Sequence, residues 1–196
     1  LGDELMAEYY ASLLRKAFAE TELILLTADP VRGIDNKEIK TVNRWNLPLI
    51  TRMMKAGDIL LGGGGSIFQD ITSKKSLLYY ISLLQTAQFK NTKVVLAGHG
   101  FGPLSPAGAR FLTPVLRRVE AVSFRDPASE EFVKRLNIEI PLVRRGVDPL
   151  WDLELPDQGE LPQIMQRNGE KTGKHVKPGL LAPALLIKDG EFALKK

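Results

Sequence analysis

The amino-acid sequence predicts an α/β fold with a parallel sheet. Short apolar runs, typical of buried strands, alternate with stretches of helical periodicity, and short connections join them. Of the 196 residues, 44% are apolar, which is enough to form a sizeable core. The unusual residues follow the apolar runs, and the carboxyl ends of parallel strands are where such sheets bind ligands. The pattern therefore predicts a cleft at one edge of the sheet.

The predicted elements follow one another from residue 3 to residue 143. Helices are expected at residues 3–18, 47–56, 75–89, 105–118 and 129–136, from apolar spacing and capping residues. Strands are expected at residues 21–27, 59–61, 93–97, 121–124 and 141–143. Residues 31–45 give no clear assignment, and Gly57 is the expected C-cap of the second helix.

The composition changes near residue 155. Residues 155–178 are rich in Gly, Pro, Gln, Lys and Glu, which predicts a linker. Apolar residues return at 180–187, so we expect residues 1–154 to form one domain and residues 179–196 to begin a second. The sequence does not begin with Met and starts directly in a predicted helix, so we expect a fragment of a longer chain.

The composition also argues against several classes of protein. Without cysteine, no disulfide framework or thiol chemistry is expected. No apolar run approaches the roughly 20 residues of a membrane helix, and no signal peptide is visible. No group of histidines and acids has metal-ligand spacing, so we expect no metal. The net charge of +4 is mild and no aromatic-interleaved basic patch accompanies it, so nucleic acid is not an expected partner.

The most distinctive stretch is residues 58–70. Its apolar run leads into four glycines and a serine: Gly62, Gly63, Gly64, Gly65 and Ser66. Each glycine costs about 0.5–1 kcal/mol relative to alanine inside a regular element, so four in a row predict a tight loop. With the serine as N-cap of a following helical turn, the loop would bind an anion through backbone N–H groups. The alternative is a strand-to-helix connection without a ligand.

The spacing of these glycines excludes two familiar nucleotide sites. A dinucleotide-binding fingerprint needs a third glycine where Ile67 or Phe68 stands. A Walker-type phosphate loop ends in Gly-Lys-Ser/Thr, which is absent here. A phosphate or sugar phosphate therefore remains the expected kind of ligand.

The charge distribution around this stretch is uneven. Residues 71–119 contain no Asp or Glu but carry seven basic residues, namely Lys74, Lys75, Lys90, Lys93, Arg110, Arg117 and Arg118. Because the window starts directly after the glycines, we expect a positive potential at the cleft that attracts an anionic substrate. Solvated basic residues on helix faces are the alternative.

Four side chains are candidates for chemistry, and each has a plainer alternative. His99, between two glycines, is expected to have an uncovered ring that exchanges a proton near neutral pH, or to be a turn histidine bonded to backbone. Arg125 and Asp126 follow a strand and form either an anion clamp with its orienting partner or a helix cap beside an ion pair. Asp70 is either a base toward a sugar hydroxyl or a cap. Asp148 also follows a predicted strand, and His175 falls in the predicted linker.

Several of these segments together resemble the polysaccharide pyruvyl transferase family. The resemblance rests on the run Leu-Gly-Gly-Gly-Gly-Ser-Ile-Phe-Gln-Asp, the following Lys-Ser-Leu-Leu-Tyr-Tyr, Gly-Phe-Gly-Pro at 100–103 and Val-Ser-Phe-Arg-Asp at 122–126. The opening Leu-Gly-Asp-Glu is similar to the end of that family's Asn-x-Gly-Asp-Glu motif. The match covers about residues 1–150. The sequence departs from the family pattern at His99, where a residue such as Gln is expected. The first strand of the family's N-terminal domain is also expected to be missing.

The resemblance implies a two-domain, glycosyltransferase-B-like architecture, of which this chain would be the Rossmann-like N-terminal half. It implies phosphoenolpyruvate as donor substrate, no cofactor, and a sugar of a cell-surface polysaccharide or its lipid-linked precursor as acceptor. The product would be a pyruvate ketal, of the kind that anchors surface-layer proteins. The implied place of action is the cytoplasm, at the inner face of the membrane, with peripheral association through the acceptor.

In that reaction the glycines, Ser66, Arg125 and Asp126 would bind the donor, and Asp70, His99 and Arg125 would take part in catalysis. Two other functions fit the same sequence features. One is a nucleotide-sugar-dependent glycosyltransferase of the same architecture, and the other is a non-catalytic sugar-phosphate-binding module.

Overall fold

A computed structural model describes residues 2–17, 20–28, 39–146 and 184–188. These residues form an α/β fold around a seven-stranded sheet of order β2-β1-β7-β3-β4-β5-β6. All strands run parallel except β7, which is antiparallel to both of its neighbours. The predicted fold class, a Rossmann-like α/β sheet, is confirmed.

The element bounds are as follows. The strands are β1 (Leu23–Thr27), β2 (Lys40–Asn43), β3 (Ile59–Phe68), β4 (Lys93–Phe101), β5 (Ala121–Phe124), β6 (Leu142–Arg145) and β7 (Ala184–Ile187). The helices are α1 (Gly2–Ala17), α2 (Leu47–Met53), α3 (Lys74–Phe89), α4 (Pro106–Leu116) and α5 (Pro127–Arg135). None of these helices is long and apolar enough to cross a bilayer.

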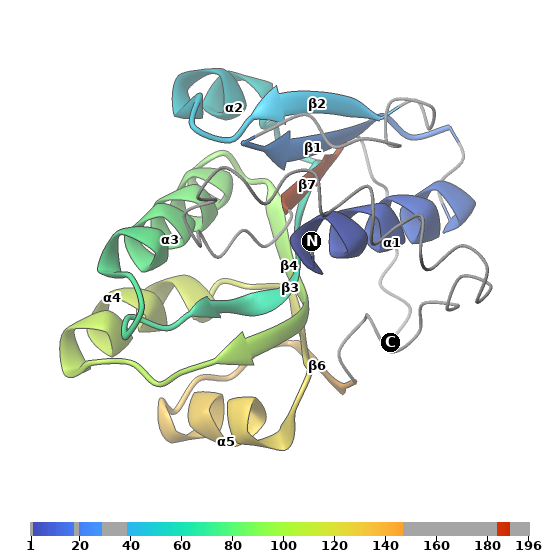
Figure 1. The fold of residues 1–196 in the computed structure, drawn as a ribbon. Helices are drawn as coiled ribbons and strands as arrows, with labels where there is room; N and C mark the ends of the chain where they lie inside the picture. Colours follow the sequence, from blue (N-terminus) through green and yellow to red (C-terminus); the bar gives the residue numbers. More distant parts are fainter. Residues whose placement is uncertain (1, 18–19, 29–38, 147–183, 189–196) are drawn as a thin grey trace, which may run out of the picture.

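Helices cover both faces of the sheet, with α1 on one side and α2, α3, α4 and α5 on the other (Figure 1). Side chains of a strand alternate between the two faces, and β3 shows the result. Leu60 packs in the core beneath α2, α3 and α4, whereas Ile59 and Leu61 pack in the core beneath α1. The chain thus builds two apolar layers from one run of branched residues.

The glycine stretch does not form the loop that we predicted. β3 continues through all four glycines and Ser66, and it pairs with β4 in parallel register, with Gly62 opposite Leu96 and Gly65 opposite His99. Backbone pairing needs no side chain, so glycines can extend a strand when a neighbouring strand supplies the hydrogen bonds. The N-cap prediction for Ser66 is therefore wrong. Helix α3 begins eight residues later, with Ser73 as its N-cap.

One of these glycines explains how α1 packs against the sheet. Gly64 has a φ of +78°, and a Cβ built there would lie 2.5 Å from the Sδ atom of the buried Met6. A larger residue at this position would be strained by the positive φ and would displace the Met6 side chain. Close packing against a helix, rather than a loop, is what this glycine provides.

The last described strand also differs from expectation. We expected residues 179–196 to begin a second domain, but Ala184–Ile187 form β7 between β1 and β3 in the one sheet. The four residues are buried, and without them the facing backbone groups of β1 and β3 would lack strand partners. The predicted linker at 155–178 lies outside the described residues.

Smaller differences concern boundaries. Helix α2 ends at Met53, so its C-cap is Met54 and not Gly57 as predicted. The region 31–45, which the sequence left unassigned, contains β2. The N-caps of α4 and α5 are Ser105 and Asp126, whose side chains accept backbone N–H groups in the first turn.

Candidate functional site

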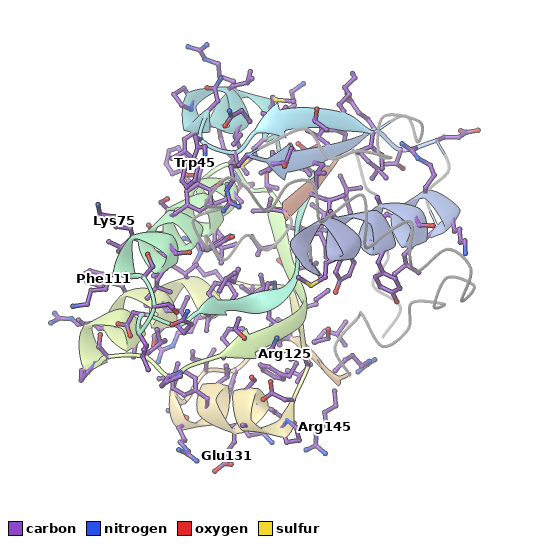
Figure 2. The ribbon with its side chains drawn as sticks, viewed as in Figure 1. Trp45, Lys75, Phe111, Arg125, Glu131 and Arg145 are labelled. Carbon is purple, nitrogen blue, oxygen red and sulfur yellow. The ribbon has the colours of Figure 1, made fainter. Side chains whose placement is uncertain are left out.

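Two of the predicted site residues, Ser66 and Arg125, lie close together at the carboxyl edge of the sheet. Ser66 lies near the end of β3, and Arg125 directly follows β5, with β4 between them. The Nη2 of Arg125 donates a hydrogen bond of 2.5 Å to the Oγ of Ser66. Figure 2 labels Arg125 beside the ends of the central strands. Its side chain is 31% exposed, so the guanidinium is held at the edge of the sheet and part of the side chain reaches solvent.

Asp126 is the N-cap of α5, one of the two alternatives, and it also lies beside Arg125. Its Oδ1 accepts the backbone N–H of Ser129 at 2.7 Å and caps α5, while its Oδ2 lies 3.4 Å from the Nε of Arg125. Partial burial works to raise the pKa of Asp126, but the hydrogen bonds from Ser129 and Arg125 outweigh it and hold the pKa below its usual value. The carboxylate stays ionised and orients the guanidinium.

Asp70 is bound to the start of α4. Its carboxylate accepts the backbone N–H of Ser105 at 2.8 Å and also the Ser105 hydroxyl. These hydrogen bonds hold the pKa of Asp70 below its usual value. A Cβ built on Gly108 would lie 2.6 Å from one carboxylate oxygen of Asp70, so the carboxylate packs directly against the backbone of α4. Ser105 is the N-cap of α4, so Asp70 holds the capping residue in place, and its role as a base toward a sugar hydroxyl stays a prediction.

The expectation that His99 has an uncovered ring is wrong. Its side chain is fully buried, because β4 runs straight through the glycines that we took for a turn. The ring packs edge-on against Phe68, with centroids 5.2 Å apart, and Nδ1 lies 3.2 Å from the carbonyl oxygen of Gly65. A Cβ on Gly62 would lie 2.8 Å from Nε2, so the glycines make room for the imidazole. Burial lowers the pKa of His99 to about 4, so the ring is neutral at pH 7.

Comparison with known families identifies the chain. The model of the polysaccharide pyruvyl transferase family matches residues 1–183. The chain belongs to the polysaccharide pyruvyl transferase family. No curated protein and no solved structure gives a significant match. Family membership supports a transferase that acts on a polysaccharide, and it agrees with the resemblance seen in residues 1–150.

The basic window of this pyruvyl transferase chain does not lie at one edge of the sheet. Lys74, Lys75 and Arg110 lie in the first halves of α3 and α4, near the carboxyl edge. Lys90, Lys93, Arg117 and Arg118 lie where these helices end and where β4 begins, at the opposite edge. A βαβ unit returns the chain from one edge to the other, so a continuous run of charge is divided between them. The prediction of one positive cleft edge is therefore only partly correct.

A further residue of the site is Gly100, which the sequence did not single out as a site residue. A Cβ built there would lie 2.8 Å from both the Nε of Arg125 and the Oγ of Ser66. The backbone of β4 thus forms the floor beneath the Arg125–Ser66 pair. The signal available in the sequence was its position as the second glycine after an apolar strand.

Gly100→Ala is expected to lower pyruvyl transfer about tenfold while changing the melting temperature little. The added methyl group displaces the end of the Arg125 side chain, which can move, rather than backbone, which cannot. Steady-state kinetics with a thermal melt would test this. A variant with full activity would show that the position of the guanidinium is not critical.

His99→Gln is expected to keep activity but to flatten the pH dependence of stability. The folded protein holds the histidine pKa at about 4 against 6.5 when unfolded, so the unfolded chain binds the proton first as the pH falls. This difference removes about 3 kcal/mol of stability between those two pH values, and glutamine does not titrate. Denaturant unfolding at several pH values would measure it. Loss of turnover at unchanged stability would instead support the proton-transfer role predicted from sequence.

Two other residues from the sequence analysis, Asp148 and His175, lie outside the described residues. Among the described residues, no group of three or more histidines and acids could hold a metal ion.

Proposed function

We propose that the complete protein transfers a pyruvyl group from phosphoenolpyruvate to a sugar of a cell-surface polysaccharide or its lipid-linked precursor. The observation that carries this proposal is the Arg125–Ser66 pair at the carboxyl edge, in a chain of the pyruvyl transferase family. A donor with a carboxylate and a phosphate requires a fixed cation in a position open to solvent. Arg125 supplies that cation, and Asp126 orients it.

The proposed reaction consists of an addition and then a substitution at the same carbon. One sugar hydroxyl adds to the second carbon of phosphoenolpyruvate, and its proton is transferred to the methylene carbon, which becomes a methyl group. A second hydroxyl of the same sugar then attacks that carbon, the bond to the phosphate oxygen breaks, and phosphate leaves with the remaining proton. The product is a cyclic pyruvate ketal, and no electrons are gained or lost.

The residues of the site have different parts in this proposal. Arg125 binds the donor's carboxylate or phosphate and stabilises the charge that develops on the leaving group. The Ser66 hydroxyl fixes one guanidinium nitrogen and faces the same ligand. In this proposal Asp70 and His99 support the fold around the site and take no part in the chemistry, because Asp70 is bonded to Ser105 and His99 is buried against Gly65.

The test is incubation of the complete gene product with phosphoenolpyruvate and a panel of lipid-linked or surrogate sugar acceptors. We expect acceptor-dependent release of phosphate and a gain of mass that matches a ketal. Thermal stabilisation by a nucleotide sugar, without phosphate release from phosphoenolpyruvate, would favour the glycosyltransferase. Binding of phosphoenolpyruvate without turnover would favour the binding module.

A further inference from the structure

We propose that Trp45, backed by Tyr79 and Arg44, is a platform on which a sugar ring of the acceptor chain stacks, at a distance from the sugar that reacts. The proposal rests on the proposed function, because it names the acceptor as an extended saccharide. It concerns residues that the donor site does not use.

Trp45 is exposed to an unusual degree for a tryptophan. The residue is 61% exposed, although tryptophans are highly buried on average. It is held in place by its own turn, because its backbone N–H donates to the Oδ1 of Asn43 at 2.9 Å. Its ring also packs on Tyr79 of α3, with centroids 5.1 Å apart. A large apolar surface is therefore both open to solvent and fixed.

A buried arginine supports the platform from inside. Arg44 is only 4% exposed, and its guanidinium carbon lies 5.2 Å from the Trp45 ring centroid and 4.6 Å from that of Tyr79. The Nη2 of Arg44 donates to the Tyr80 hydroxyl at 2.8 Å, and the Tyr79 hydroxyl donates to the Arg44 carbonyl at 3.0 Å. This network fixes the aromatic rings before a ligand arrives, which lowers the entropic cost of binding.

The platform lies at the same edge of the sheet as the donor site. Trp45 comes two residues after β2, and β2 runs parallel to β1, β3, β4 and β5, so it is found at the carboxyl edge with Ser66 and Arg125. Figure 2 labels both Trp45 and Arg125 and shows them well apart. β2 lies three strand spacings from β3, about 14 Å at about 4.8 Å each. One monosaccharide cannot cover that distance, whereas a chain of several sugars can.

The chemistry of the surface fits a sugar better than a protein. The aliphatic C–H face of a pyranose ring stacks on a flat aromatic ring, and its hydroxyls need hydrogen-bonding groups around the rim. The exposed Asn43 and Asn46 flank Trp45, and each uses its side-chain oxygen to accept a backbone N–H, so the amide NH₂ can face a hydroxyl. A single aromatic ring with a polar rim is smaller than the apolar patches of stable protein interfaces.

The experiment measures acceptor binding against chain length. The probes are oligosaccharides from the source organism's own surface polysaccharide, freed of pyruvate by mild acid and separated by size. Calorimetry on the complete protein is expected to show that long fragments bind more tightly than single repeat units. Trp45→Ala is expected to weaken the long fragments about tenfold, as for a stacked aromatic anchor, and to leave the short ones unchanged. Trp45→Phe should restore most of the loss.

The matched control is Phe89→Ala, which removes an aromatic ring that is 83% exposed at the other end of α3. Its binding curves should coincide with those of the wild type. The platform would be overturned if Trp45→Ala kept the tighter binding of long fragments, if no fragment bound, or if the variant changed only the oligomeric state. Phosphate release from phosphoenolpyruvate with a short acceptor tests the proposed function separately, because a short acceptor does not reach Trp45.

Discussion

Arg125→Ala is expected to lower kcat/KM for pyruvyl transfer by about 100-fold or more, measured as acceptor-dependent phosphate release. The guanidinium donates a hydrogen bond to Ser66 and lies beside Asp126, and it is a cation at the glycine-rich ends of β3 and β4. Removing it takes away a fixed charge that stabilises the leaving phosphate. The kcat/KM of Arg125→Lys should lie between those of the wild type and Arg125→Ala, because an ammonium keeps the charge but lacks the planar set of donors.

The control for this experiment is Arg135→Ala on α5. Arg135 is 70% exposed and pairs with Glu131 on the same helix, so its removal changes the net charge equally without touching the site. Its activity should match the wild type, since exposed pairs of this kind contribute little. Thermal melts of both variants would show that the fold is retained. Full activity of Arg125→Ala would remove the main support for the proposed donor site.

The parts of the fold that local sequence determines could be predicted. The apolar runs at residues 21–27 and 121–124 predicted strands, because a strand of a parallel sheet is buried on both faces and therefore consists mostly of apolar residues. The residues before the prolines at 106 and 127 cap α4 and α5, and Ser and Asp favour that role. It could also be predicted that Arg125 lies near the glycine stretch, because the carboxyl ends of parallel strands lie at the same edge of the sheet.

The parts that depend on a neighbouring strand could not be predicted from the same signals. A run of glycines has no local preference for a strand, and β3 exists there because β4 pairs with it. We predicted that His99 is exposed because we assigned its glycine neighbours to a turn. These glycines instead belong to β4, and His99 is buried. The placement of β7 beside β1 and β3 joins residues more than 100 positions apart.

The same long-range pairing leads to the second large expected effect. Asp58→Ala is expected to lower the free energy of unfolding by about 3–5 kcal/mol, as measured by urea denaturation. Asp58 is fully buried, its Oδ2 accepts the backbone N–H of Lys55 at 2.8 Å, and it pairs with the Nζ of Lys188 at 2.5 Å. The variant leaves a largely buried ammonium without its counter-charge, and that desolvation cost dominates the loss.

Lys188→Ala tests the placement of β7 more directly than Asp58→Ala does. Lys188 follows β7, is 13% exposed, and also donates to the Met53 carbonyl at 2.6 Å, so it links the last described strand to α2 and β3. Its removal leaves a buried carboxylate, and a loss of similar size is expected. Lys40→Ala is the control, because its pair with Glu22 is exposed and contributes about 0–1 kcal/mol. If Lys188→Ala were as stable as this control, residues 184–188 would not belong to the sheet, and the expectation that they begin a second domain would be restored.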